Sequence, residues 1–276
     1  MKRIGLVLIT CAVLMVSVAS GQEPSHSSTV SRIEWQHDKL TIYAGSIPEG
    51  KVQIWYLEAF CRTGSTDRVW SETVIPHETK LIKKDETGQS IALESHVEPG
   101  VVVHHEIRVV KDGVSFSLHL KNTTDKPVDI DWAQPCIRVG KVTGLDQENY
   151  HKRCFIFTDI GQVMLDKLPR NEEARYKGGQ IYVPDGINLD DVNPRPLSPV
   201  KPANKLIGCV TEDGKWLLAT AWEPTQELFQ GVIRCMHADF RIGGLKAGES
   251  KTITGKVYLL PNDVDALLAA YKADFE

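Results

Sequence analysis

Hydrophobic and polar residues alternate with a period of two along most of the chain. In residues 114–121, VSFSLHLK, every second side chain is apolar, which predicts a β-strand with one buried face. The sequence NTTDKP follows and predicts a turn, because Asn and Asp bond their own backbone and Pro127 cannot continue a ladder. Alternation resumes at Val128, so we expect residues 114–138 to form a hairpin around which the other strands are arranged.

Similar alternation recurs between short turns, such as the Asp-Gly pair at residues 112–113, which is typical of β-hairpins. Near the C-terminus the period changes: Asn262 or Asp263 can cap a helix whose apolar face includes Leu267 and Tyr271. The chain is therefore predicted to be all-β, a large antiparallel β-sandwich with one short C-terminal helix. The other main predicted strands span residues 32–36, 39–44, 51–60, 79–84, 90–97, 101–110, 205–211, 215–222, 231–237 and 251–260.

Residues 162–204 interrupt this pattern with a series of prolines and glycines. A segment of this length without clear strands is either an ordered excursion over one face of the sandwich or a boundary between domains. Tyr182 and Arg195 favour the excursion. We therefore expect one β-sandwich domain over residues 22–276, with a Pro-rich excursion at about 162–204.

Residues 1–21 have the pattern of a secretory signal peptide. Lys2 and Arg3 precede an apolar run over residues 4–18, and small residues at 18–21 suit cleavage. The alternative is a membrane anchor, but the run is shorter than the ~20 residues that a membrane span requires. We expect a secreted or periplasmic protein with no stable membrane insertion after cleavage.

The net charge of the chain limits the classes of ligand that we expect it to bind. The formal net charge of −4 becomes more negative once Lys2 and Arg3 are removed, and the sequence contains no basic stripe. We therefore expect no nucleic-acid partner. An uncharged or weakly charged ligand such as a saccharide or polysaccharide fits this composition better.

Five cysteines remain after cleavage, so at least one thiol stays unpaired even where export permits disulfides. Their pairing is left open. None belongs to a CxxC pair, so the sequence predicts no structural zinc site, and it identifies no cofactor. The five are Cys61, Cys136, Cys154, Cys209 and Cys235.

Two predicted strand ends combine a tryptophan with amide or carboxylate groups. In each, an indole can stack on a sugar ring while the polar groups bond its hydroxyls. The alternative in each case is structural, either a core tryptophan with a capped turn or a plain surface turn. The substrate-binding candidates are Trp132 and Gln134 in the first stretch, and Trp222, Glu223 and Gln226 in the second.

The catalytic candidates are His237 with Asp239, which can transfer a proton or ligate a metal, and His105 inside a strand. A structural His–Asp pair and a solvated strand face are the respective alternatives. Arg241 or Arg138 would bind an anionic group of a ligand.

Three motifs resemble the galactose mutarotase-like supersandwich family: TTDKP at 123–127, GVIRC at 231–235 and LKAGE at 245–249. The resemblance implies a large β-sandwich with a sugar-binding cleft. It also implies a catalytic histidine near Gln134 and a catalytic glutamate near Cys235, and neither position keeps that residue type. The chain as a whole resembles uncharacterised exported proteins of planctomycete-type bacteria, which implies no activity.

Together these features predict a secreted or periplasmic carbohydrate-binding or carbohydrate-processing protein that is not a mutarotase. If the protein is an enzyme, a glycan hydrolase or lyase fits best, with His237 or His105 as acid or base. The alternative is a non-catalytic adhesion or scaffold β-sandwich domain whose polar clusters only satisfy turns.

We expect that the protein does not accelerate the mutarotation of α-galactose or α-glucose above the rate in buffer alone. The reason is that neither Gln134 nor Cys235 can serve as the acid or base that the resemblance places there. Polarimetry measures this directly, and a clear acceleration would contradict the alignment of the motifs.

Overall fold

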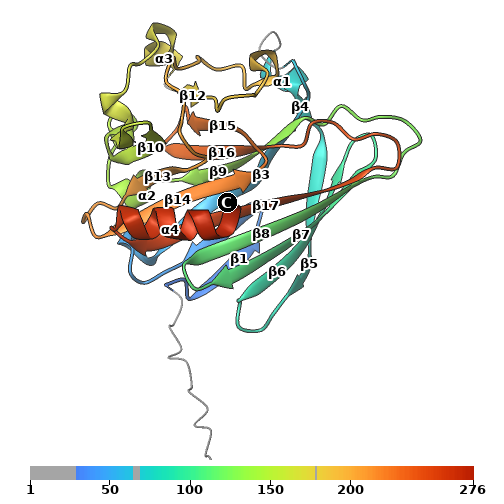
Figure 1. Cartoon of the computed structure of the whole chain (residues 1–276). Helices are drawn as coiled ribbons and strands as arrows, with labels where there is room; N and C mark the ends of the chain where they lie inside the picture. The colour runs from blue at the N-terminus through green and yellow to red at the C-terminus, as the bar shows by residue number, and fades with distance from the viewer. Residues whose placement is uncertain (1–28, 65–68, 178) are drawn as a thin grey trace, which may run out of the picture.

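Two antiparallel sheets pack face to face in the computed structural model, which describes residues 29–64, 69–177 and 179–276 (Figure 1). This architecture confirms the predicted all-β sandwich with a short C-terminal helix. The predicted signal peptide at residues 1–21 lies outside the described residues. Within them, no helix is long and apolar enough to cross a membrane.

The first sheet, sheet A, holds the strands on which the candidate site is built. Its central strands β3, β9, β16 and β15 are neighbours although they come from distant parts of the sequence. Its order is β1 (Arg32–Gln36), β2 (Lys39–Tyr43), β3 (Lys51–Cys61), β9 (Trp132–Arg138), β16 (Cys235–Arg241), β15 (Thr225–Gln230) and β12 (Gln180–Tyr182), with β4 (Val74–Ile75) paired to β3.

The second sheet, sheet B, contains the longest uninterrupted ladders. Its central strand β17 pairs with β14 on one side and β8 on the other. Its order is β11 (Gly161–Met164), β10 (Cys154–Thr158), β13 (Ile207–Val210), β14 (Trp216–Glu223), β17 (Ser250–Pro261), β8 (Gly113–Asn122), β7 (Val101–Val110), β6 (Ser90–Val97) and β5 (His77–Lys84).

The main hydrophobic core lies between the sheets. Because side chains alternate across a strand, every second residue of β16 enters it: Met236, Ala238 and Phe240. From sheet B, Trp222 packs against Phe240 and Phe116, with ring-centroid distances of 4.7 and 5.2 Å. The alternate residues of β16 point out of the sandwich.

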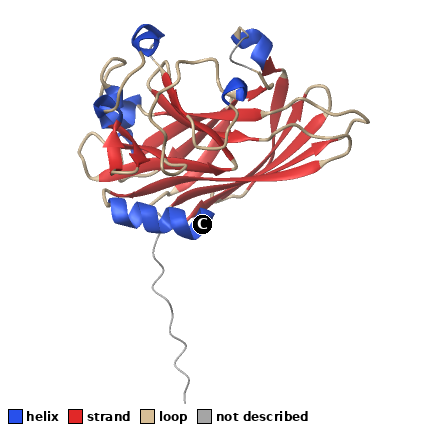
Figure 2. Cartoon of the chain, turned by 45° about the horizontal axis from the view of Figure 1, so that its top comes forward, coloured by secondary structure: helices blue, strands red, loops and turns tan. Residues whose placement is uncertain are grey.

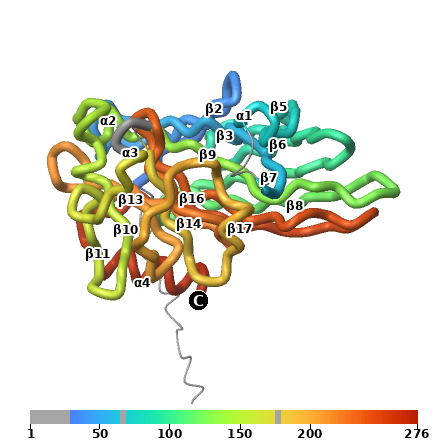
Figure 3. The backbone as a smooth tube through the Cα atoms, turned by 90° about the horizontal axis from the view of Figure 1, so that it is seen from above, coloured from blue at the N-terminus to red at the C-terminus, as the bar shows by residue number. Residues whose placement is uncertain are grey.

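Elements outside the two sheets cover part of each outer face of the sandwich (Figure 2). Helix α4 (Val264–Phe275), capped by the Asp263 side chain as predicted, buries Leu267 and Tyr271 against the outer face of sheet B. The Pro-rich excursion lies over the outer face of sheet A, as the yellow-to-orange segment seen from above in Figure 3. The other helical segments are α1 (Trp70–Thr73), α2 (Gly140–Thr143), α3 (Glu172–Lys177), η1 (Pro48–Gly50), η3 (Tyr150–Arg153), η4 (Leu165–Lys167) and η5 (Leu189–Asp191).

The predicted hairpin over residues 114–138 is wrong. Strand β8 pairs with β7 and β17 in sheet B, whereas β9 lies between β3 and β16 in sheet A. The chain therefore crosses from one sheet to the other after Asn122, whose side-chain amide donates to the carbonyls of Lys126 and Lys246. Alternation identified β8, whereas the alternating residues 128–132 lead up to β9, which begins at Trp132. The pattern carries no information about which strand each one pairs with.

Gly255 should be sensitive to substitution because the Trp222 indole packs directly on it. A Cβ atom at Gly255 would lie 2.3 Å from Cδ2 of Trp222. We expect Gly255→Ala to lower the free energy of unfolding by about 1–3 kcal/mol, as overpacked cores do. Urea unfolding measures the change. Gly45→Ala is the control, since its added methyl would meet no described atom within 4 Å. Equal effects of the two substitutions would contradict the packing.

Candidate functional site

Polar side chains gather on the outer face of sheet A. Strand β16 contributes Cys235, His237 and Asp239, the residues that alternate with its core-facing side chains. The neighbouring strand β9 contributes Gln134 and Cys136 by the same alternation. All five are buried, because the excursion and α1 cover this face. Two strands that are distant in sequence thus bring their functional groups to one place.

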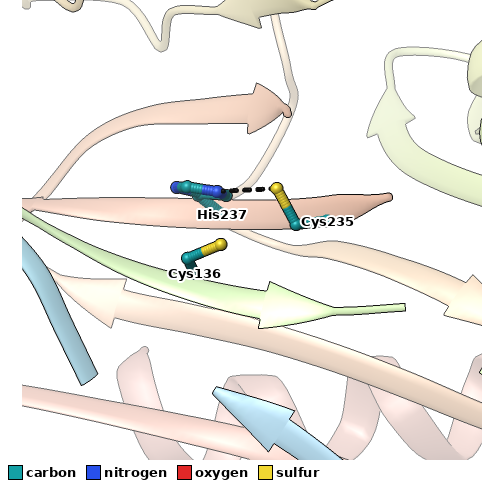
Figure 4. A group of neighbouring side chains, drawn as sticks. All are labelled: Cys136, Cys235 and His237. Carbon is teal, nitrogen blue, oxygen red and sulfur yellow. Dashed lines mark hydrogen bonds between the residues drawn. The ribbon is translucent and has the colours of Figure 1, made fainter. Parts of the chain in front are cut away.

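His237 is the centre of this group. Its Nδ1 lies 2.7 Å from the Gln134 amide and 3.5 Å from Oδ1 of Asp239. Its Nε2 lies 3.2 Å from Sγ of Cys235, and its ring meets Phe229 edge to face with centroids 5.0 Å apart. Figure 4 shows the imidazole beside the Cys235 and Cys136 thiols. Both ring nitrogens therefore have polar neighbours inside a buried site.

A pair of carboxyl groups lies beside the histidine. Glu227 on β15 is directly opposite Asp239 on β16, and both are fully buried. Burial and the charge of Asp239 raise the pKa of Glu227 well above its usual range. Burial also raises the pKa of Asp239 to about 6, although contact with His237 opposes the shift. Two like charges this close cannot both ionise easily, so the pair retains a proton near neutral pH.

A narrow cleft of about 80 Å³ opens from this cluster to solvent. Gln134 and His237 form part of its floor, and Glu58 and Trp70 lie along its wall. Arg195, from the excursion, also lines the cleft. The cleft therefore combines a carboxylate, a guanidinium, an amide, an imidazole and an indole in one small space.

Several buried oxygen atoms at this cluster have no hydrogen-bond partner among the described residues. They are Oε1 of Gln134, Oδ1 of Asn193, Oε1 of Glu227 and both carboxylate oxygens of Asp239. The oxygen and nitrogen of the Gln134 amide can exchange places by rotation. In either orientation one of them faces His237 and the other has no hydrogen-bond partner among the described residues. Because an unpaired buried polar group is costly, such a concentration marks a place where a ligand can supply the missing partners.

The excursion is held on the sheet by Arg241 at the end of β16. Its guanidinium donates to Oε1 of Gln226 at 2.8 Å, to Oδ2 of Asp131 at 3.3 Å and to Oδ2 of Asp191 at 3.4 Å. Asp191 belongs to the excursion, and two residues further on the backbone N–H of Asn193 donates to Glu227 at 2.9 Å. These contacts fix the segment that forms one wall of the cleft.

Of the residues predicted from the sequence, the structure brings Gln134, His237 and Asp239 together. Arg138 lies on the same face of sheet A but lines a neighbouring cavity of about 460 Å³, with Lys51 and Arg234. Its guanidinium carbon is 5.6 Å from the Trp55 ring. Arg138 therefore belongs to a second, basic cavity.

The two tryptophans predicted to stack on a sugar have no exposed ring. Trp132 is completely buried beneath Trp70, with ring centroids 6.2 Å apart. Trp222 is 1% exposed and lies between the sheets, on the opposite side of sheet A from the cleft. Neither indole can serve as a stacking surface in this structure. Trp70 and Phe229 are the aromatic side chains beside the imidazole at the cleft.

His105 is a core residue of sheet B. Its ring lies 2.9 Å from the Tyr56 hydroxyl and 2.8 Å from that of Ser95, so both nitrogens are occupied. Burial lowers the pKa of His105 to about 3, which keeps the ring neutral. His105 therefore lies in the core, away from the cleft that Gln134 and His237 line.

Three further substrate-binding candidates have structural roles instead. Glu223 pairs with Lys205 at the end of β14, away from the cleft. Gln226 and Arg241 bind each other and Asp191, and through these bonds they anchor the excursion.

The sequence prediction did not assign Glu58, Trp70, Asn193 or Glu227 to the site. Glu227 lies on the buried strand β15, whose sequence TQELFQ shows no regular alternation. The sequence predicts a strand end or a surface turn at residues 222–227, so it does not predict that Glu227 is buried. Asn193 lies in an irregular segment and Trp70 begins the short helix α1, and no local pattern indicates where either lies on the sheet.

All five cysteines after residue 21 are free and buried in the structure. Cys154 and Cys209 lie directly opposite each other on β10 and β13 in sheet B. Cys136 and Cys235 lie near His237 on sheet A. The structure contains no disulfide among these five residues.

No protein-family model and no curated protein matches the chain. Among solved structures, the Slr1438 protein from Synechocystis sp. PCC 6803 aligns over 85% of this chain and 98% of its own, with 8% identity and a TM-score of 0.47. A galactose mutarotase-like protein from Lactobacillus casei ATCC 334 aligns over 82% and 99%, with 9% identity and a TM-score of 0.43.

An α-N-acetylgalactosaminidase from Bifidobacterium bifidum, solved as a complex with GalNAc, aligns over 88% of this chain and 36% of its own, with 12% identity and a TM-score of 0.49. These matches agree with the predicted distant resemblance to galactose mutarotase-like proteins. At this level of identity the likeness concerns the fold, and no residue role is carried over from it.

The Asp131–Arg241 contact should make stability depend on pH. Burial raises the pKa of Asp131 from 3.8 to about 6, although Arg241 opposes the shift. Because the folded state holds this proton more tightly than the unfolded state, the stabilisation is complete below pH 4 and is lost as pH rises through 6. Asp131→Asn remains neutral throughout.

We therefore expect the unfolding free energy of Asp131→Asn, relative to wild type, to increase between pH 4 and pH 7. Urea unfolding at several pH values measures this difference, in which the titration of all other groups cancels. A difference that stays constant, or that decreases with pH, would show that burial does not control this carboxyl group.

Proposed function

We propose that this protein is an exported saccharide-binding protein, and that a glycan binds at the mouth of the cleft between sheet A and the excursion, with hydroxyl groups reaching into it. The observation that carries the proposal is the set of buried, unpartnered oxygens at Gln134, Asn193, Glu227 and Asp239 among the described residues. The pattern of residues 1–21 supports export.

The unpartnered atoms favour a ligand with several hydroxyl groups. A sugar hydroxyl both donates and accepts a hydrogen bond, so it can complete an amide of either orientation and a carboxyl oxygen. Asn193 and Gln134 line the cleft directly, whereas Glu227 and Asp239 lie behind them. Glu58 accepts from a hydroxyl and Arg195 donates to one, so the two walls offer complementary partners.

The apolar part of the cleft suits a sugar ring as well. Trp70 is partly exposed at the cleft, and Phe229 lies beside His237. An aromatic side chain can cover the C–H face of a pyranose while the polar groups hold its edge. Trp70 therefore takes the stacking role that the sequence suggested for Trp132.

Proton transfer to a bound sugar would fall to the two titratable groups that reach the cleft beside the amide, Glu58 and His237. Asp239 contacts Nδ1 of His237 from the buried side and would orient the imidazole. This arrangement supports hydrolysis or elimination of a glycan as the chemistry to test once a ligand is found.

A non-catalytic scaffold domain is the second candidate. The specific observation in its favour is that Trp132 and Trp222 serve the packing of the domain. In that case the cleft would be a by-product of the Arg241 network, and no glycan would bind it.

A glycan array, followed by calorimetric titration of any ligand found, tests the proposal. We expect Trp70→Ala to weaken binding by ~5- to 150-fold, by analogy with the ~1–3 kcal/mol of base stacking on aromatic side chains. Glu58→Gln should also weaken binding, because an amide oxygen is a weaker acceptor than a carboxylate oxygen for the hydrogen bond that a sugar hydroxyl donates.

Trp55→Ala is the matched control, since Trp55 is an exposed indole on the same sheet at the neighbouring basic cavity. All variants must keep the wild-type melting temperature, because Trp70 also packs on Trp132. Binding that Trp55→Ala weakens and Trp70→Ala does not would place the ligand in the other cavity. No binding to any glycan would favour the scaffold.

A further inference from the structure

Two thiols and an imidazole converge at the floor of the cleft. The ligand atoms of Cys136, Cys235 and His237 all lie within 4.8 Å of one another, and the three side chains are buried. Cys136 lies on β9, and the other two lie on the adjacent strand β16, two residues apart on the same face. Figure 4 shows the three groups directed at a common space.

We propose that these three residues form a binding site for one thiophilic divalent metal ion of the Zn²⁺ class. The donor set decides the class of metal: thiolate and imidazole ligands favour zinc over magnesium or calcium, which prefer oxygen. The proposal is independent of saccharide binding.

The distances suit a metal without a change of the backbone. In a tetrahedral site with Zn–S and Zn–N bonds of about 2.3 and 2.1 Å, a sulfur and a nitrogen ligand lie about 3.5 Å apart. Sγ of Cys235 and Nε2 of His237 are 3.2 Å apart in the structure. These two ligand atoms therefore already lie at nearly the separation that a bound ion requires.

The groups behind His237 prepare its Nε2 atom for a metal. With the Gln134 amide oxygen turned toward the ring, Nδ1 carries the proton and donates to Gln134 at 2.7 Å, with Asp239 at 3.5 Å. The lone pair of Nε2 then points to the side on which Cys235 lies. Histidine ligands of metals usually donate their other N–H to an amide or carboxylate partner in this way.

The site also has an entrance and an open position. Cys235 and His237 line the cleft, whereas Cys136 lies behind them. Three protein ligands with a fourth position open to a cleft is the arrangement of catalytic rather than structural zinc sites. With the metal bound, His237 is a ligand, and Glu58 remains the titratable group of the cleft.

Binding balances charge in the buried site. Two neutral thiols each lose a proton, two metal–sulfur bonds replace the two S–H bonds, and the two thiolates neutralise the dication. The search for CxxC pairs in the sequence did not predict this site. Cys136 and Cys235 are distant in sequence and meet only when β9 and β16 pair.

Cobalt titration of the full mature protein tests the proposal. The protein is first reduced and stripped with a chelator, and Co²⁺ is then added while absorption is recorded. We expect one equivalent of Co²⁺ to bind, with thiolate-to-cobalt charge-transfer absorption and the visible bands of a tetrahedral ion. Zn²⁺ should displace it and should raise the melting temperature, since it binds only the folded state.

Cys136→Ser and Cys235→Ser should each remove or strongly reduce the charge-transfer absorption. Cys154→Ser and Cys209→Ser are matched controls, because these buried cysteines also oppose each other across two strands but belong to no described cluster of metal-ligating side chains. Gln134→Ala should keep the absorption but weaken cobalt binding by about 10- to 100-fold, as loss of a partner of a histidine ligand does.

Far-ultraviolet dichroism must show that each variant is folded. The proposal fails if the folded wild type shows no charge-transfer absorption. It also fails if Cys136→Ser and Cys235→Ser keep the absorption, or if the Cys154 and Cys209 variants lose it equally. Unchanged cobalt affinity in Gln134→Ala would overturn the role assigned to the groups behind His237.

Discussion

The contact on which the site depends is the guanidinium of Arg241 bridging three segments of the chain. It joins Asp131, which precedes β9, to Gln226 on β15 and to Asp191 in the excursion. Each bond alone is modest, but together they satisfy a buried carboxylate and fix the position of the excursion. Asn193, which lines the cleft, lies only two residues after Asp191 in the excursion. Without this bridge, sheet A would keep its core face and lose the cover of its polar face.

One face of sheet A contributes to the hydrophobic core, and the other face carries the candidate site. Phe240 and the other core-facing residues of β16 contribute to the main core, which carries the free energy of folding. Among the residues between them, Asp239 is a buried carboxyl group that weakens the fold unless a ligand completes its hydrogen bonds. Such a departure from full satisfaction is expected where a protein binds something, and among the described residues five of the eleven unpartnered buried side-chain atoms gather at this cluster.

The sequence predicted most strands because burial of one face imposes a period of two, and it predicted α4 because Asp263 caps an amphipathic run. It could not predict the partners of each strand, since pairing is a contact between distant residues; the false hairpin of β8 and β9 is the consequence. For the site, polar residues at strand positions identified His237, Asp239 and Gln134. The same reasoning failed for Trp132 and Trp222, because a large aromatic ring fits the core and a sugar site equally well.

The place of β17 in sheet B has a consequence for how the protein is made. This strand is the last in the sequence, yet it fills the centre of its sheet between β14 and β8. Until β17 has left the ribosome, β8 and β14 each present an unpaired edge, and sheet B remains incomplete. Folding of this domain therefore waits for β17 and is governed by contacts between residues distant in sequence. A chain with this order of strands stays incompletely folded until β17 is available. Its unpaired strand edges need protection from edge-to-edge association during that time.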